Sequence, residues 1–122
     1  MDPLIEKRGA GFHVVSEGNG HISREEIVIE DGAGTLAVGT ILGKVTATGD
    51  YKQVDLAGED GEEVSAGVLF GAVDATDAEV RAAAHVRYAE VLGAELVYPT
   101  GATSGNIATI NGQLAALGII VR

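Results

Sequence analysis

The sequence contains no cysteine and no tryptophan, and it has only two prolines, two phenylalanines and three tyrosines. The absence of cysteine excludes disulfide bonds, thiolate metal sites and cysteine nucleophiles together. Because aromatic side chains are so few, alanine, valine, isoleucine and leucine must fill the core. A chain of 122 residues forms one domain that buries roughly two thirds of its unfolded surface. Packing or oligomerisation therefore has to stabilise it.

Positive charge is also scarce, because 18 acidic residues outnumber eight basic ones and give a formal net charge of -10. A surface that binds nucleic acid neutralises phosphates with lysine and arginine, so this balance argues against a nucleic-acid partner. Nine acids and a single base, Lys52, lie between Asp50 and Glu79. We expect this acidic stretch to face water.

Long apolar runs are absent as well, and none approaches the roughly 18 residues that a membrane span requires. The sequence therefore predicts no membrane partner. Residues 1–8 mix acids with bases, and no apolar segment typical of a secretory signal follows them, so we expect no signal peptide. A protein made in the cytoplasm fits both observations.

Glycine, in contrast, is abundant at 18 residues, and the texture of the sequence divides the chain in two. Residues 1–24 mix charges with glycines and lack sustained periodicity, which predicts a flexible N-terminal arm. Such an arm could be removed without changing how the rest of the chain melts. Residues 25–122 form the second part, a β-rich domain in which short β-branched runs alternate with glycine.

The β-rich part has the pattern of a small barrel or sandwich, with short strands at close intervals. A turn around Gly49 joins two of these strands into a hairpin. Gly67 and Gly71 interrupt a later strand and predict bulges or close backbone approaches. The predicted strands cover residues 27–29, 36–38, 41–42, 45–48, 52–56 and 64–73.

Residues 76–92 fit two structures. Thr76 and Glu79 have the spacing of a helix capping box, and apolar residues recur at helical intervals after them. The same segment also alternates, with Val86 and Tyr88 on one side and His85 on the other. The residues alone leave helix and strand open here.

The last segment predicts a short C-terminal helix followed by a strand. Ser104 or Asn106 could cap the helix, and Gly118 would end it. Residues 119–121 are apolar on both faces, which predicts a buried closing strand. The residues expected to share the buried helix face are Ile107, Ile110, Leu114 and Leu117.

Motifs for catalysis and cofactor binding are weak. Residues 32–37, GAGTLA, match a loose dinucleotide fingerprint, but the residues that follow make a poor helix, so a glycine-rich turn is favoured. Residues 101–105, GATSG, lack the glycine two positions before the serine that a nucleophile elbow requires. Eighteen carboxylates could supply an acid–base pair, yet little aromatic surface is present to bind a sugar. The sequence predicts no enzyme and no cofactor.

Metal sites are equally poorly supported. His13, His21 and His85 have no local ligand motif, and we expect the histidines of the N-terminal segment to be exposed. The acidic residues 59–63 lack the alternating ligands of an EF-hand loop and predict a solvated hairpin tip. We therefore expect no metal.

Five stretches, taken in order, resemble the head decoration proteins of lambda-like bacteriophages. They are GTLAVGTILG at residues 34–43, GVLFGAVDA at 67–75, RYAEVL at 87–92, LVYP at 96–99 and LGIIV at 117–121. No single stretch is specific, and the resemblance rests on their order and spacing. Tyr98 stands where a tryptophan is common before the proline.

The resemblance implies a mainly β fold, with a barrel or sandwich-like domain, a short C-terminal helix and a flexible N-terminal arm. It also implies a homotrimer on the outer surface of the virion, at threefold positions of the expanded capsid, with no catalysis. The arm would contact the major capsid protein, and the segment around residues 80–88 would be extended rather than helical.

Within the arm, the stretch with most β-propensity is Phe12, His13, Val14 and Val15. We expect these residues to bind the capsid by adding a strand to a sheet edge. Two alternatives remain at this point: a trimeric tail or baseplate β-domain, and a small ligand-binding β-barrel.

Overall fold

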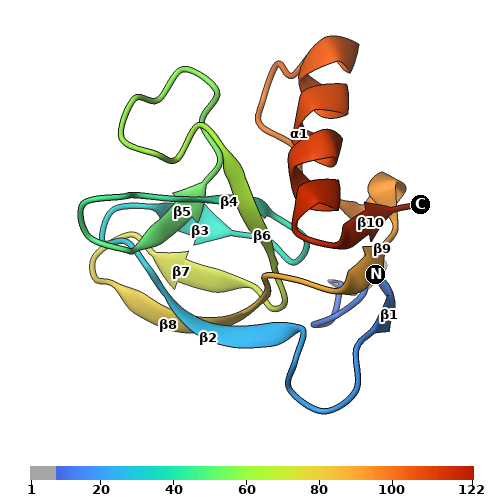
Figure 1. Cartoon of the computed structure of the whole chain (residues 1–122). Helices are drawn as coiled ribbons and strands as arrows, with labels where there is room; N and C mark the ends of the chain where they lie inside the picture. Colours follow the sequence, from blue (N-terminus) through green and yellow to red (C-terminus); the bar gives the residue numbers. More distant parts are fainter. Residues whose placement is uncertain (1–7) are drawn as a thin grey trace, which may run out of the picture.

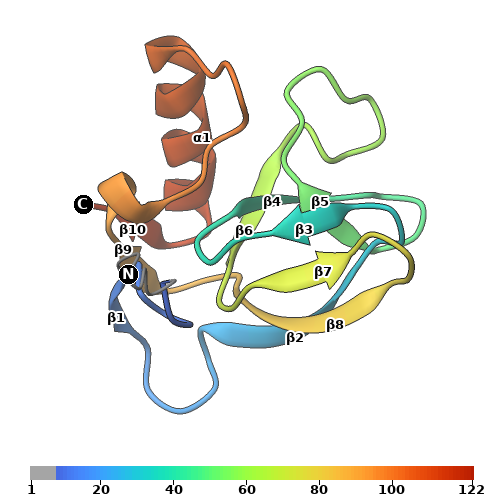
Figure 2. The same cartoon turned by 180° about the vertical axis from the view of Figure 1, so that it is seen from behind.

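The computed structural model describes residues 8–122. They form a mainly β domain with a closed barrel, two smaller sheets and one α-helix, as Figures 1 and 2 show from opposite sides. The predicted fold class is confirmed. The elements in chain order are β1 Val14–Glu17, β2 Arg24–Ile29, β3 Gly34–Leu36, β4 Ile41–Lys44, β5 Tyr51–Gln53, β6 Ser65–Leu69, β7 Val73–Ala75, β8 Val80–His85, β9 Ala89–Val91, the 3-10 helix η1 Gly93–Glu95, α1 Ser104–Ala116 and β10 Ile119–Val121.

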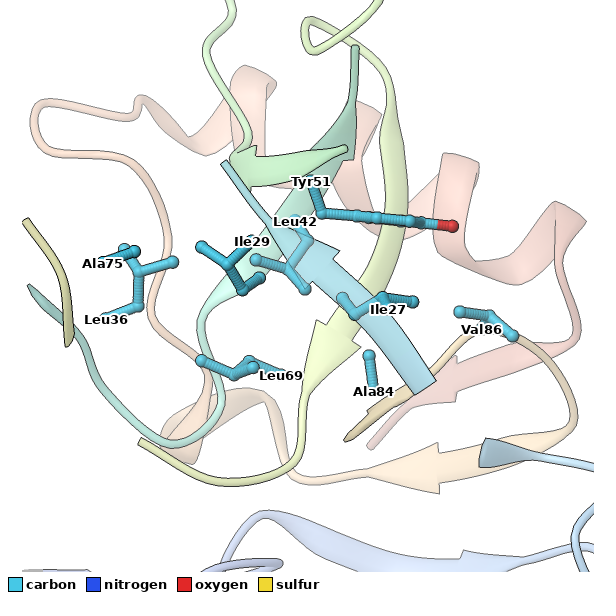
Figure 3. Close-up of a cluster of buried hydrophobic side chains, with 9 residues drawn as sticks. All are labelled: Ile27, Ile29, Leu36, Leu42, Tyr51, Leu69, Ala75, Ala84 and Val86. Carbon is cyan, nitrogen blue, oxygen red and sulfur yellow. The ribbon is translucent and has the colours of Figure 1, made fainter. Parts of the chain in front are cut away.

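Five strands form the barrel, in the order β2-β5-β4-β6-β8. β2 and β8 are antiparallel along their whole lengths, from Arg24 opposite His85 to Ile29 opposite Val80. Alternate residues of a strand point to opposite faces, so Ile27 and Ile29 enter the barrel together. Figure 3 shows the apolar side chains that meet there, which fill the interior. They are Ile27, Ile29, Leu36, Leu42, Tyr51, Leu69, Ala75, Ala84 and Val86.

The predicted hairpin is confirmed as β4 and β5, which are antiparallel with Lys44 opposite Tyr51. The expected strand at residues 45–48 is wrong, because these residues form the hairpin turn. The Val45 N–H donates to the Asp50 carbonyl, and the Gly49 N–H donates to the Val45 carbonyl, both at 2.8 Å. Gly49 has φ 76°, a left-handed conformation that glycine adopts without strain. Local turn bonds therefore replace the strand.

The strand expected at residues 64–73 is divided in two. β6 belongs to the barrel, whereas β7 pairs with β3 in a separate two-stranded sheet. The chain bends at residues 70–72 between them. At Gly67 the close backbone approach is confirmed, because a β-carbon there would lie 2.8 Å from the carbonyl oxygen of His85.

The ambiguous segment is extended, as the resemblance implied, and the helix suggested by its capping box is wrong. β8 pairs with β2 and β6 on its two edges, and this pairing outweighs local helix propensity. The expected alternation stops at His85, which is fully buried although its neighbours Ala84 and Val86, expected on the opposite face, are buried too. Tyr88, expected beside Val86, has φ 48° and is 57% exposed. A bend at residues 87–88 separates β8 from β9.

The predicted C-terminal helix is confirmed as α1. Its N-cap is Thr103, one residue before the expected Ser104, and the Asn106 N–H donates to its side chain at 3.1 Å. Ile110 and Leu114 are fully buried between the helix and the barrel. Gly118, at φ 83°, follows the helix as expected.

β10 closes the fold, but it is not buried on both faces as expected. It pairs in parallel with β9 at the edge of the sheet β1-β9-β10. Ile119 points into the core and is fully buried, whereas Ile120 points outward and is 38% exposed. An edge strand with one covered face explains the difference.

Acidic side chains mostly lie at the surface, as expected for the stretch from Asp50 to Glu79. Glu62 is the exception and is buried, because its carboxylate folds back to accept the Asp60 N–H at 3.1 Å. The loop at residues 59–63 is thus not fully solvated. No helix of residues 8–122 is long and apolar enough to cross a membrane.

Candidate interaction surface

The sheet β1-β9-β10 stands beside the barrel, on the side where α1 packs (Figure 1). β1 is antiparallel to β9, with Val14 opposite Val91 and Glu17 opposite Ala89. The register shifts between Val14 and Ser16, which leaves Val15 as a bulge. One face of the sheet covers the second core, so the other face and the β1 edge remain at the surface.

Exposed apolar side chains gather on and next to this sheet. Among the described residues, seven large hydrophobic side chains are exposed. Six of them belong to β1, to β10 or to segments adjoining β1 and β9, and only Val64 lies elsewhere. Apolar groups that gather at a surface are typical of an interaction site. The six are Phe12, Val15, Ile22, Tyr88, Leu92 and Ile120.

The four residues expected to bind a partner lie together at the start of β1, but their side chains point different ways. Phe12 is 53% exposed and Val15 is 49% exposed. His13 is fully buried, and Val14 is partly buried against the domain. Backbone bonds hold the turn before β1, including the Gly11 N–H to the Phe70 carbonyl at 2.9 Å. Phe12 and Val15 are thus the two side chains presented outward.

β1 also offers a free backbone edge. It occupies the end of the sheet order, so β9 is its only strand partner among residues 8–122. The Leu92 N–H donates to the His13 carbonyl at 2.8 Å, and the Gly18 N–H donates to the Tyr88 carbonyl at 3.1 Å. The opposite edge of β1 presents backbone groups that another strand could pair with.

The segment of residues 1–24, expected to be a flexible arm, is described from residue 8 onward, and residues 1–7 lie outside the described residues. Its described part contains β1, which pairs with β9. The predicted boundary between arm and domain, after Arg24, therefore places two paired strands in different parts. Its binding to a capsid and its mobility in the free protein stay predictions.

Behind β1 lies a cluster of polar side chains. His13 and His85 are both fully buried, with ring centroids 6.2 Å apart and an edge-to-face angle of 82°. The Glu17 carboxylate contacts His85 Nε2. The expectation of an exposed histidine is therefore wrong for His13, whereas His21 is exposed. The sequence held no local signal for this cluster, because His85 is 68 positions from Glu17.

Arg24 completes the cluster at the surface. Its guanidinium donates to both carboxylate oxygens of Glu17 at 2.9 Å and lies 4.0 Å from the centre of the Phe70 ring. The Arg24 hydrogen bonds, followed by that of His85, hold the pKa of Glu17 below its usual value. Burial, and then the neighbouring His85, lower the pKa of His13 to about 4. A neutral His13 thus suits this environment.

The two remaining sequence motifs lie in a strand and in a loop. Residues 34–36 of the glycine-rich motif form strand β3, so its glycines do not open a helix toward a phosphate. Residues 101–103 form the loop that leads into α1. Within residues 8–122, no three histidine or acidic side chains are grouped so that they could hold a metal ion.

A comparison with protein families identifies the chain. The family model of the bacteriophage lambda head decoration protein D matches residues 3–119. The chain belongs to this family. A search of curated proteins finds no match. Membership implies a structural protein of the phage head that binds the capsid.

Proposed function

We propose that this protein decorates the outer surface of the phage head as a homotrimer at threefold positions and stabilises the expanded capsid. In this proposal the segment Phe12, His13, Val14 and Val15 contacts the major capsid protein. The observation that carries the assignment is the free edge of β1, flanked by the exposed side chains of Phe12 and Val15. Family membership supports the capsid as the partner.

The contact follows from the chemistry of a strand edge. An extended segment of the capsid protein would pair with β1, and main-chain hydrogen bonds would supply affinity. Phe12 and Val15 would then enter apolar pockets of the capsid and provide specificity. His13 would remain inside the domain and support the strand from behind, because its ring is fully buried.

A trimer would convert modest contacts into firm attachment. Three β1 edges on one rigid particle would bind adjacent capsid subunits, and linkage multiplies individual affinities. The domain has few aromatic residues, so an apolar interface between copies would add to its core. Light scattering of the free protein at micromolar concentration measures this state, and a trimer is the expected result.

Net charge supports a position outside the shell. The formal charge of -10 would repel packaged DNA on the inside, and on the outside it does not compete for the genome. Resistance to internal pressure would come from the raised energy needed to separate subunits that share a trimer. No catalysis is required for this role.

Cosedimentation with expanded empty capsids tests the proposal. The natural protein should pellet with the capsids. The double variant Phe12→Ser, Val15→Ser should bind at least about tenfold more weakly, which corresponds to 1.4 kcal/mol. Val64→Ser is the matched control, because Val64 has the same 49% exposure as Val15 but precedes β6.

Three outcomes would contradict the proposal. Absence of the natural protein from the capsid pellet would refute decoration. Equal binding by the double variant would remove β1 from the contact. A loss of binding with Val64→Ser that matches the loss with the double variant would show that the effect is not specific to β1. Such a result would contradict a contact made by this sheet.

A further inference from the structure

We propose that His13, His85 and Glu17 form an acid-sensitive latch, which holds β1 on the barrel while His13 is neutral and releases it when His13 gains a proton. The observation behind this proposal is a pair of fully buried histidines that joins the segment before β1 to the end of β8. We call these three residues the histidine latch.

The latch fastens both ends of β1 to the same barrel residue. His13 immediately precedes β1 and packs edge-to-face against the His85 ring. Glu17 is the last residue of β1 and contacts Nε2 of the same ring. His85 itself is fixed in β8, where it pairs with Arg24 of β2 and Val68 of β6. Loss of the latch therefore affects β1 more than the barrel.

Buried nitrogen atoms make the latch sensitive to protons. Within residues 8–122, neither ring nitrogen of His13 has a hydrogen-bond partner, and Nδ1 of His85 has none either. A neutral imidazole tolerates such a site at a moderate cost. A protonated His13 would place a charge and two N–H donors there without an acceptor, which is far less favourable.

The charged groups around His13 do not offset this penalty. Glu17 of β1 is engaged by His85 and by Arg24 of β2. Glu95 of η1 is paired with Arg8 at 2.9 Å. The Glu95 carbonyl oxygen and the His13 ring both lie near Gly39, since a β-carbon there would be 2.6 Å from that oxygen and 3.6 Å from His13 Cγ, yet among residues 8–122 neither His13 ring nitrogen has a hydrogen-bond partner.

The direction of the pH effect follows from the lowered pKa of His13. Burial, and then His85, bring this pKa from 6.5 to about 4 while β1 is docked, and release restores the ordinary value. The free energy that favours docked β1 is therefore greatest above pH 6.5, and it declines progressively as the pH falls from 6.5 to about 4. Within that window each pH unit lowers the ratio of docked to released β1 by up to about tenfold.

Release would alter the proposed capsid contact, and this consequence rests on the proposed function. The exposed Phe12 and Val15 owe their directions to the docked β1 and to the turn before it. Acid would free the segment that carries them, so decoration should loosen below pH 6. Release itself is a property of the free protein.

Hydrogen–deuterium exchange of the free protein between pH 7.5 and 4.5, corrected for intrinsic exchange rates, tests the latch. Peptides that cover residues 8–17 should lose protection at least about tenfold toward pH 5, while β2 and β8 stay protected. His13→Leu should remove this pH dependence, because leucine is apolar and does not titrate. His21→Leu, at an exposed site, should behave as the natural protein does.

Two results would overturn the latch: constant protection of residues 8–17 in the natural protein, or an unchanged pH dependence in His13→Leu. Should His13→Leu not fold, an NMR titration of the natural protein decides instead, because an imidazole of His13 that titrates near 6.5 contradicts the proposal. Capsid cosedimentation at pH 7.5 examines the proposed function separately, so a failure of either is distinguishable.

Discussion

Gly67 of β6 lies so close to His85 of β8 that a β-carbon at residue 67 would be 2.8 Å from the His85 carbonyl oxygen. β6 and β8 are neighbours in the closed barrel, with Val68 opposite His85. This oxygen belongs to the backbone of β8, which pairs with β2 on its other edge, so it cannot move aside freely. Close packing of two backbones at this point thus depends on a residue without a side chain.

Gly67→Ala should therefore destabilise the protein by about 1–3 kcal/mol through overpacking. Urea denaturation measures the change. Gly112→Ala is the matched control, because Gly112 is exposed in α1 and a β-carbon there meets nothing within 4 Å. It should stabilise the protein by up to about 1 kcal/mol, since alanine favours helix over glycine. A neutral effect of Gly67→Ala would show that β6 and β8 separate easily.

Leu114 anchors α1 to the barrel and should be among the most sensitive positions. It is fully buried with Ile110, Val68 and Ile119 in the second core. Leu114→Ala would leave a cavity and should lower the free energy of unfolding by about 2–5 kcal/mol. Ala115→Ser, on the exposed side of the same helix, should change it by less than about 0.5 kcal/mol. Similar losses for both would contradict the packing of α1 described above.

Thr103 caps α1 through a reciprocal arrangement with Asn106. The Thr103 side chain accepts the Asn106 N–H, and the Asn106 side chain accepts the Thr103 N–H at 3.0 Å. Thr103→Ala should destabilise the protein by about 1 kcal/mol. Ser104→Ala removes a hydroxyl from the next residue and should have a smaller effect, which thermal melting can compare. A larger effect of Ser104→Ala would place the cap one residue later.

Glu17 should make the stability of the protein depend on pH in a second, more acidic range. Its pKa is lowered first by Arg24 and then by His85. A carboxylate with a lowered folded pKa stabilises above its unfolded value of 4.5 and loses this effect as the pH falls through the folded pKa. Glu17→Gln should make Tm less dependent on pH below pH 4.5 and should lower Tm at pH 7. Glu26→Gln, whose partner Arg81 is exposed, should change little.

The sequence predicted those parts of the fold that depend on local pattern. The β-branched run at residues 27–29 located the end of β2, and apolar spacing with Gly118 located α1. The exact cap was missed by one residue, because Thr103 and Ser104 are chemically similar N-cap residues. Glycine-rich turns were harder: residues 45–48 have strand composition, yet backbone bonds across the turn fold them back.

The interaction surface could be predicted only in part. β-propensity selected residues 12–15, and two of these four, Val14 and Val15, do begin a strand. The burial of His13 was not predictable, because its neighbour His85 lies 72 positions later and no spacing rule connects them. Tyr88 was misplaced for a related reason, since its left-handed φ of 48° interrupts an alternation that looks continuous in sequence.

Removal of residues 1–24 has one expected effect on Tm from the sequence and another from the structure. A flexible arm predicts that the truncated chain melts as the full chain does. The structure gives a different expectation, because truncation removes β1 from β9 and takes His13 away from the second buried histidine, His85. It also deletes Arg24, which covers Phe70. We expect a folded barrel that melts about 10 °C lower. This shift corresponds to a loss of about 2 kcal/mol, because each kcal/mol lowers the Tm of a small domain by roughly 4–8 °C.

Circular dichroism melting of the truncated chain measures this difference, with the double variant Phe12→Ser, Val15→Ser as the control. That variant changes only exposed side chains of the same segment, so its Tm should stay within about 2 °C of the natural value. A truncated chain with unchanged melting would show that β1 contributes nothing to the fold and would restore the independent arm. A lowered Tm for the truncated chain alone would mean that capsid binding by this segment has to be tested with the point variants, because truncation would change stability and contact together.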